Sequence, residues 1–160
     1  MKKKAKLIEL AHKEGVLQQV AALPYRFRTN GKIDFLIITS RRTKRLIVPK
    51  GWPIAGTPDC DAAAIEAEEE AGVRGNIGNQ PIGSFSYVKD FSDVLIPVIA
   101  NVFPLRVKKV KSHWKERARR KRKWMSAAKA AAVLSDRGLA ELVMLASVML
   151  EKHSGRTVVA

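Results

Sequence analysis

Four glutamates crowd into one short stretch of a strongly basic chain, which reads AIEAEEEAG over residues 64–72. On a helix, Glu66, Glu69 and Glu70 stand at i, i+3 and i+4, so their carboxylates share one face about a turn apart, while Glu68 points elsewhere. Like charges at that spacing repel, and anions near the end of a helix oppose its dipole. A hard divalent cation, Mg²⁺ or Mn²⁺, would relieve both penalties, because carboxylate oxygens are its preferred protein ligands.

A solvated acidic face that balances a basic protein is the alternative interpretation of these glutamates. The preceding loop favours the metal site, because residues 49–58 hold two glycines and three prolines and allow close approach of the backbone. Gly51 lies fifteen positions before Glu66, and Gly72 ends the predicted helix.

The glutamates must be positioned by a sheet, a loop and a helix. Asn30-Gly31 predicts a tight hairpin turn, and Asp59 stands where a helix N-cap belongs. Ser126 is a second predicted cap, at the start of a helix that follows Trp124 and Met125. We expect the following strands and helices: strands over 16–29, 33–39, 46–48, 77–87 and 94–107, and helices over 59–71 and 139–152. This order indicates an α+β or α/β protein with a mixed sheet between helices.

Length and composition predict a single domain over residues 1–160, with a core of about 16–150 and short tails. The 160 residues, 46% of them hydrophobic, suffice for one buried core. No apolar run is long enough to span a membrane and no secretory leader opens the sequence, so we expect a cytoplasmic protein that does not bind membranes. Cys60 is the sole cysteine, which agrees with a reducing compartment.

A formal charge of +15 predicts that the surface attracts polyanions. Eleven of the 30 Lys and Arg residues fall between Arg106 and Lys123. This basic segment, with Arg120 near its centre, fits a clamp for a polyphosphorylated ligand or a solvated face. Nucleic-acid binding, through phosphate contacts and stacking on Trp114 and Trp124, ranks behind both because no recognised nucleic-acid signature is present.

The glycine and glutamate spacing resembles the Nudix box, in which a glycine and a helix of the form Arg-Glu-aliphatic-x-Glu-Glu-x-Gly-aliphatic stand at fixed separation. The matching residues are Gly51, Glu66, Ala67, Glu69, Glu70, Gly72 and Val73. Residues 48–53 are also similar to the branch of diphosphoinositol polyphosphate and diadenosine polyphosphate hydrolases. The resemblance covers roughly residues 16–150 and implies an α/β/α sandwich.

The resemblance implies an Mg²⁺-dependent pyrophosphohydrolase. Glu66, Glu69 and Glu70 with the Gly51 carbonyl would hold Mg²⁺ or Mn²⁺, and one of the glutamates would activate water to cleave a phosphoanhydride. The substrate would be a nucleoside diphosphate linked to another group, a dinucleoside polyphosphate or a diphosphoinositol polyphosphate. We expect five basic residues to bind it: Lys50, Arg26, Arg28, Arg42 and Arg120.

Two residues depart from the box, because Thr57 replaces its first glutamate and Ile65 replaces its arginine. An isoleucine cannot donate the hydrogen bonds that help to hold the glutamates. Either a nearby cation such as Lys50 takes this role, or catalysis is weakened and the protein binds a phosphorylated ligand or nucleic acid. A monomer and a homodimer both remain open.

Overall fold

A mixed β-sheet forms the centre of this computed structural model, which describes residues 1–159, with side chains described as far as Lys152. The described residues form the following helices: α1 (Lys2–Glu14), α2 (Asp59–Ala71), α3 (Ala127–Val133) and α4 (Arg137–Val159). They form the following strands: β1 (Leu17–Phe27), β2 (Ile33–Thr39), β3 (Leu46–Ile47), β4 (Lys50–Gly51), β5 (Val73–Ile77), β6 (Gly83–Asp90), β7 (Leu95–Val110) and β8 (Arg122–Ser126). β1 and β7 run parallel at the centre, and the other pairs are antiparallel.

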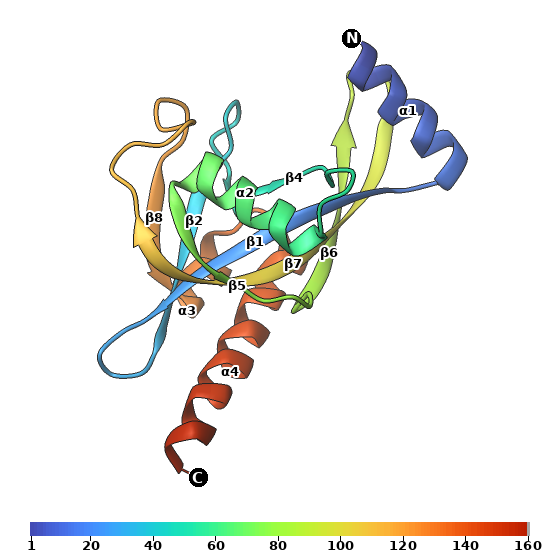
Figure 1. Cartoon of the computed structure of the whole chain (residues 1–160). Helices are drawn as coiled ribbons and strands as arrows, with labels where there is room; N and C mark the ends of the chain where they lie inside the picture. The colour runs from blue at the N-terminus through green and yellow to red at the C-terminus, as the bar shows by residue number, and fades with distance from the viewer. Residues whose placement is uncertain (160) are drawn as a thin grey trace.

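Helices cover both faces of the sheet (Figure 1). On one face the small side chains of α2, among them Ala63 and Ala67, pack on Val20 and Leu36. On the other face α3 and α4 pack on a second cluster that includes Phe35. The expected α/β/α sandwich with a mixed sheet is therefore confirmed, and the alanines of α2 let this helix lie close to the strands.

Local sequence signals located most of these elements. The Asn30-Gly31 turn joins antiparallel β1 and β2, with Gly31 at a φ of 81°. Ser126 caps α3 by accepting a hydrogen bond from the backbone N–H of Lys129. The N-cap expected at Asp59 is wrong, because Pro58 holds that position and Asp59 is already the first helical residue. Asp59 and Asp61 instead place negative charge in the first turn, where it complements the helix dipole.

Two boundaries also differ from the expectation. The strand predicted over 77–87 is divided into β5 and β6, with residues 78–82 forming a connection between them. The loop predicted over 49–58 contains the short strand β4, which pairs with β1 through Gly51 opposite Val20. This pairing fixes the loop to the centre of the sheet, directly beside α2.

The segment 111–122 folds over the C-terminal end of α2. The backbone N–H of Glu116 donates to the carbonyl of Glu69 at 3.1 Å, and the Trp114 indole N–H donates to the carbonyl of Glu70 at 3.1 Å. Arg122 donates to the carbonyls of Ala71 and Gly72 at 2.8 and 3.3 Å. The last carbonyls of a helix have no partner within the helix, so the basic segment satisfies them and places positive charge at the negative end of the dipole.

Residues 1–159 include no helix that is both long enough and apolar enough to cross a bilayer.

The C-cap at Gly72 offers a test of this arrangement. Gly72 has a φ of 67°, and a Cβ atom there would approach Arg122 and the Trp114 ring at 2.7 Å. Gly31 also has a positive φ, but a Cβ atom there meets nothing within 4 Å. We expect Gly72→Ala to lower the free energy of unfolding in urea by about 1–3 kcal/mol more than Gly31→Ala does, because only Gly72 adds overpacking to backbone strain. Equal losses would show that the segment 111–122 does not pack closely on α2.

Candidate active site

Gly51 and Glu66 meet at the point where β4 lies against α2. A Cβ atom added to Gly51 would overlap the carboxylate of Glu66, so only glycine allows this approach. Among the described residues, Glu66 has no ion-pair partner and no hydrogen-bond partner. Gly51 and Glu66, two residues of the metal site that the resemblance implies, therefore lie next to each other, and Glu66 keeps a carboxylate available for other chemistry.

Glu70 is buried and fully engaged. Its side chain accepts a hydrogen bond from the backbone N–H of Lys50 at 3.1 Å through Oε1, and from the Arg120 guanidinium at 2.8 Å through Oε2. Arg120 is only 8% exposed and also donates to Glu116 and to the carbonyl of Thr39. Glu70 thus joins three parts of the fold: α2, the loop with Gly51 and the basic segment.

Glu69 and Glu68 point in different directions. Glu69 is partly exposed and lies 3.5 Å from the ammonium group of Lys115. Glu68 pairs with Arg74 at 2.5 Å and with Lys111 at 3.2 Å, away from Glu66. The sequence predicted a solvated Glu68 that points away from the other three glutamates, whereas Glu68 forms ion pairs and lines a surface notch together with Glu69.

Burial and repulsion destabilise the charge on Glu66. Burial raises the pKa of the Glu66 carboxyl to about 7, with further contributions from Glu70, Glu69 and Glu116. Burial also raises the pKa of Glu70, although the charge on Arg120 opposes this shift. Negative charge at this end of α2 is therefore only partly compensated by the side chains around it.

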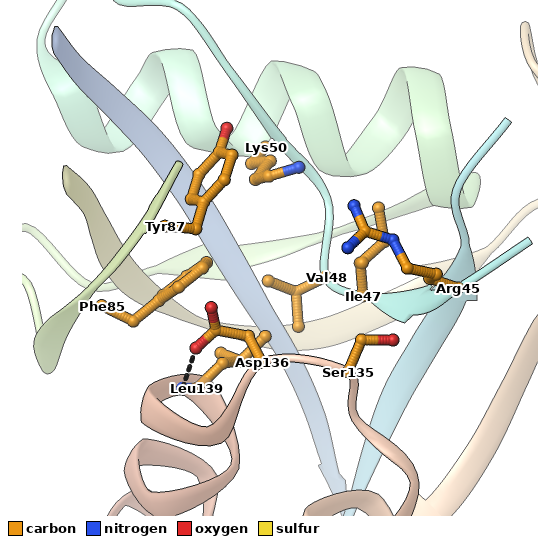
Figure 2. A pocket seen from close by; sticks show the side chains of 9 residues that line it. All are labelled: Arg45, Ile47, Val48, Lys50, Phe85, Tyr87, Ser135, Asp136 and Leu139. Carbon is orange, nitrogen blue, oxygen red and sulfur yellow. Dashed lines mark hydrogen bonds between the residues drawn. The ribbon is translucent and has the colours of Figure 1, made fainter. Parts of the chain in front are cut away.

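A small cavity opens beside Lys50 on the face of the sheet that carries α4. Figure 2 shows Lys50 next to the Tyr87 ring, with Arg45 on the opposite side of the cavity. The Lys50 ammonium lies 5.2 Å from the centre of the Tyr87 ring. Burial is the main reason that the pKa of Lys50 falls to about 8, despite the nearby charge of Glu70. Apolar side chains complete the wall of the cavity: Ile47, Val48, Phe85 and Leu139.

The five predicted substrate-binding residues do not lie together. Lys50 lines the cavity, and Arg42 lies close enough to Lys89 to help lower the pKa of that lysine, after burial and Arg41. Arg120 is buried against Glu70 and does not form an exposed clamp.

Arg26 and Arg28 lie apart from the glutamates. Both pair with Asp34, at 3.6 and 3.2 Å. Gly51 pairs with Val20, so Arg26 stands six residues, or about 20 Å, further along β1. The structure does not bring these two arginines to the site.

Sequence reasoning missed the part that Glu116 plays. This acid comes from the middle of the basic segment, pairs with Arg41 and Arg120, and contributes to the raised pKa of Glu66. Tyr87 was also missed; its hydroxyl donates to Gln19 while its ring faces Lys50. Neither residue has a local pattern that marks it, because each reaches the site through long-range contacts.

The residues present fit a divalent metal by their chemistry. Glu66 and the carbonyl of Gly51 are hard oxygen donors, and the charge of Glu66, which Arg120 compensates only in part, is the condition that Mg²⁺ or Mn²⁺ would relieve. Glu69 is a further candidate donor, because its ion pair with Lys115 is 3.5 Å long and partly exposed. Within residues 1–152, no three acidic, His or Cys side chains are already gathered around one point. Metal binding would therefore require small rearrangements of these side chains.

Known proteins similar to this chain identify its family. Nudix hydrolase 17, mitochondrial, of Arabidopsis thaliana is 30% identical over 150 residues, which cover 89% of this chain and 79% of that protein. Nudix hydrolase 21, chloroplastic, of the same plant is 32% identical over 120 residues, which cover 72% of this chain and 59% of that protein. The chain belongs to the Nudix hydrolase family.

A solved structure agrees with this family. The Ap4A hydrolase of C. elegans superposes with a TM-score of 0.63 at 20% identity, covering 84% of this chain and 98% of the other. At that identity the likeness establishes the fold. No protein-family model matches the sequence.

The pair between Glu70 and Arg120 gives a prediction for stability. Arg120→Gln leaves a buried carboxylate without its cation, and we expect this to lower the free energy of unfolding by about 3–5 kcal/mol at neutral pH. Glu70→Gln in the same chain removes the unpaired charge and should recover most of the loss. Arg119→Gln is the matched control, because Arg119 is exposed and should change stability by less than about 0.5 kcal/mol. Equal effects of Arg119→Gln and Arg120→Gln, measured by urea unfolding, would rule out a buried pair.

Proposed function

We propose that the protein is an Mg²⁺- or Mn²⁺-dependent hydrolase of phosphoanhydride bonds. The observation that carries this proposal is the carboxylate of Glu66, which lies against Gly51 without an ion-pair partner beside Glu69 and Glu70. Membership of the Nudix hydrolase family supports the reaction class. The residues that depart from the Nudix box leave Glu66, Glu69 and Glu70 in place.

The three glutamates have different tasks in this proposal. Glu66 would hold the metal through one carboxylate oxygen and accept the proton of water through the other, because it alone among the three has no ion-pair partner within the described side chains. Glu70 is a positioning residue, since it holds the backbone at Lys50 and so fixes Gly51 over α2. Glu69 and the Gly51 carbonyl complete the metal-binding set. A bound Mg²⁺ would neutralise phosphate oxygens and act as a Lewis acid.

Arg120 supports the proposal that another cation takes the place of the missing box arginine. Ile65 is 40% exposed and lines a surface notch with Glu68 and Glu69. The cation that holds Glu70 comes instead from the basic segment, through Arg120. Lys50, the replacement expected from the sequence, contributes its backbone N–H to Glu70.

The substrate we propose is a small molecule with two or more linked phosphates. Lys50 and Arg45 line the cavity on the α4 face of the sheet, and Arg42 and Lys89 lie near them. Cations around a partly enclosed site favour phosphate oxygens over neutral ligands. The candidates are a nucleoside diphosphate linked to another group, a dinucleoside polyphosphate and a diphosphoinositol polyphosphate.

Two further expectations belong to this proposal. The chain acts as a single domain over residues 1–160 in the cytoplasm. Nucleic-acid binding ranks lower than small-molecule binding, because Trp114 and Arg122 are committed to the end of α2 and Trp124 is covered by Arg26.

Hydrolysis of a phosphoanhydride panel with Mg²⁺ or Mn²⁺ tests the reaction. We expect turnover of at least one substrate, and a loss of kcat of about 100-fold or more in Glu66→Gln, because a general base contributes at least that factor. Glu68→Gln is the matched control and should keep nearly full activity, since Glu68 is engaged by Arg74 and Lys111 and contacts neither Gly51 nor Arg120. Tight binding of a substrate without turnover would favour the alternative, a Nudix-fold protein that only binds phosphorylated ligands.

Metal binding has a separate readout that needs no activity. Millimolar Mg²⁺ or Mn²⁺ should raise the thermal midpoint by a few degrees, as expected for about tenfold excess over the dissociation constant. Glu66→Gln combined with Glu69→Gln should abolish this rise, whereas Glu68→Gln should preserve it. An unchanged midpoint of the parent protein in several buffers would contradict a metal site.

A further inference from the structure

The outer face of α4 carries a stripe of apolar side chains that no other part of the described chain covers. One line of exposed residues follows the helix at positions i, i+4, i+7 and i+11: Glu141, Leu145, Val148 and Lys152. Met144 and Met149 flank this line, and the four apolar residues are between 39% and 60% exposed. We call these six residues the α4 stripe. Figure 1 shows the C-terminal half of α4 extending away from the strands.

The order of residues in the α4 stripe is self-complementary. In an antiparallel pair of α4 helices whose twofold axis passes between residues 146 and 147, position n faces position 293 − n of the other copy. Met144 then faces Met149, and Leu145 faces Val148. Glu141 faces Lys152 at both ends, so each charge meets one of opposite sign.

The positive charge of the chain disfavours most other ways of pairing two copies. Two copies with a formal charge of +15 repel each other over most orientations. Residues 138–150, however, contain no Lys or Arg and one acid, Glu141. Within residues 138–150 two copies can therefore approach without direct repulsion, and the two Glu141–Lys152 pairs add attraction, while Arg137 adds positive charge one turn beyond each Glu141.

We infer that the protein forms a homodimer through antiparallel pairing of the α4 stripe. The interface spans the eleven residue steps from Glu141 to Lys152, about 16 Å of helix. So short a helix pair buries less area than a standard stable interface. The dimer is consequently weak and concentration-dependent. This inference is independent of the proposed hydrolase activity, because the α4 stripe includes no residue of the candidate active site.

Sedimentation velocity of the full chain, from low micromolar to several hundred micromolar protein, tests the dimer. The parent protein should shift from monomer toward dimer as its concentration rises. Glu141→Lys makes both ends of the pair repulsive and should raise the dissociation constant about tenfold. Adding Lys152→Glu to Glu141→Lys reverses both charges and should restore the parent value. Leu145→Asp should abolish association, because it places a charge in the apolar centre.

Leu95→Asp is the matched control, since Leu95 is 69% exposed at the start of β7 and lies outside the α4 stripe. This variant should associate like the parent, and circular dichroism should show that every variant keeps its helix content. A parent protein that stays monomeric throughout would overturn the inference. A dimer that survives Leu145→Asp would place the interface elsewhere, and a double charge reversal that fails to restore association would overturn the antiparallel register.

Discussion

The buried contact between Glu70 and Arg120 is the interaction on which the rest of the site depends. One oxygen of Glu70 holds the backbone at Lys50, and the other holds the guanidinium of Arg120. A buried ion pair gains little net stability over apolar packing, but losing one partner is costly. The pair therefore acts less as a source of stability than as a constraint, because it allows only one placement of the Gly51 loop and the basic segment against α2.

That constraint explains how a basic protein tolerates glutamates at the end of a helix. The segment 111–122 satisfies the last carbonyls of α2 with Trp114, Arg122 and the backbone of Glu116. Arg120 compensates Glu70, while Lys115 lies near Glu69 at the surface. Among the described side chains, none forms an ion pair with Glu66, and the charge of Arg120 only partly offsets its raised pKa. Part of the positive charge of the basic segment is thus used inside the fold and is not available to bind a polyanion. Because these cations pair with groups other than Glu66, a divalent metal fits beside the Glu66 carboxylate.

The sequence predicted the features that depend on neighbouring residues, and it missed those that depend on long-range contacts. The α2 boundaries followed from an uninterrupted alanine- and glutamate-rich stretch that ends at Gly72, and the approach of Glu66 to Gly51 followed from the motif spacing. Arg120 was selected for its charge, but its burial against Glu70 depends on the path of a loop fifty residues away in sequence.

Arg26 and Arg28 were predicted to bind the substrate, but they lie too far from the glutamates. Arg26 lies in β1 and Arg28 directly follows this strand, but distance along β1 separates both from Gly51. The local sequence predicts that a strand is present. The position of that strand relative to a loop depends on the pairing register. That register, with Gly51 opposite Val20, is a tertiary property that no local signal in the sequence specifies.

Anomalous diffraction from crystals of the protein grown with Mn²⁺ tests the central claim most directly, since it locates the metal and the surrounding side chains together. The account predicts a Mn²⁺ ion that contacts the Gly51 carbonyl and the Glu66 carboxylate, with Glu70 still bonded to Arg120 and to the Lys50 backbone. A metal bound elsewhere, or a Glu70 carboxylate that has left Arg120 to become the principal ligand, would contradict it.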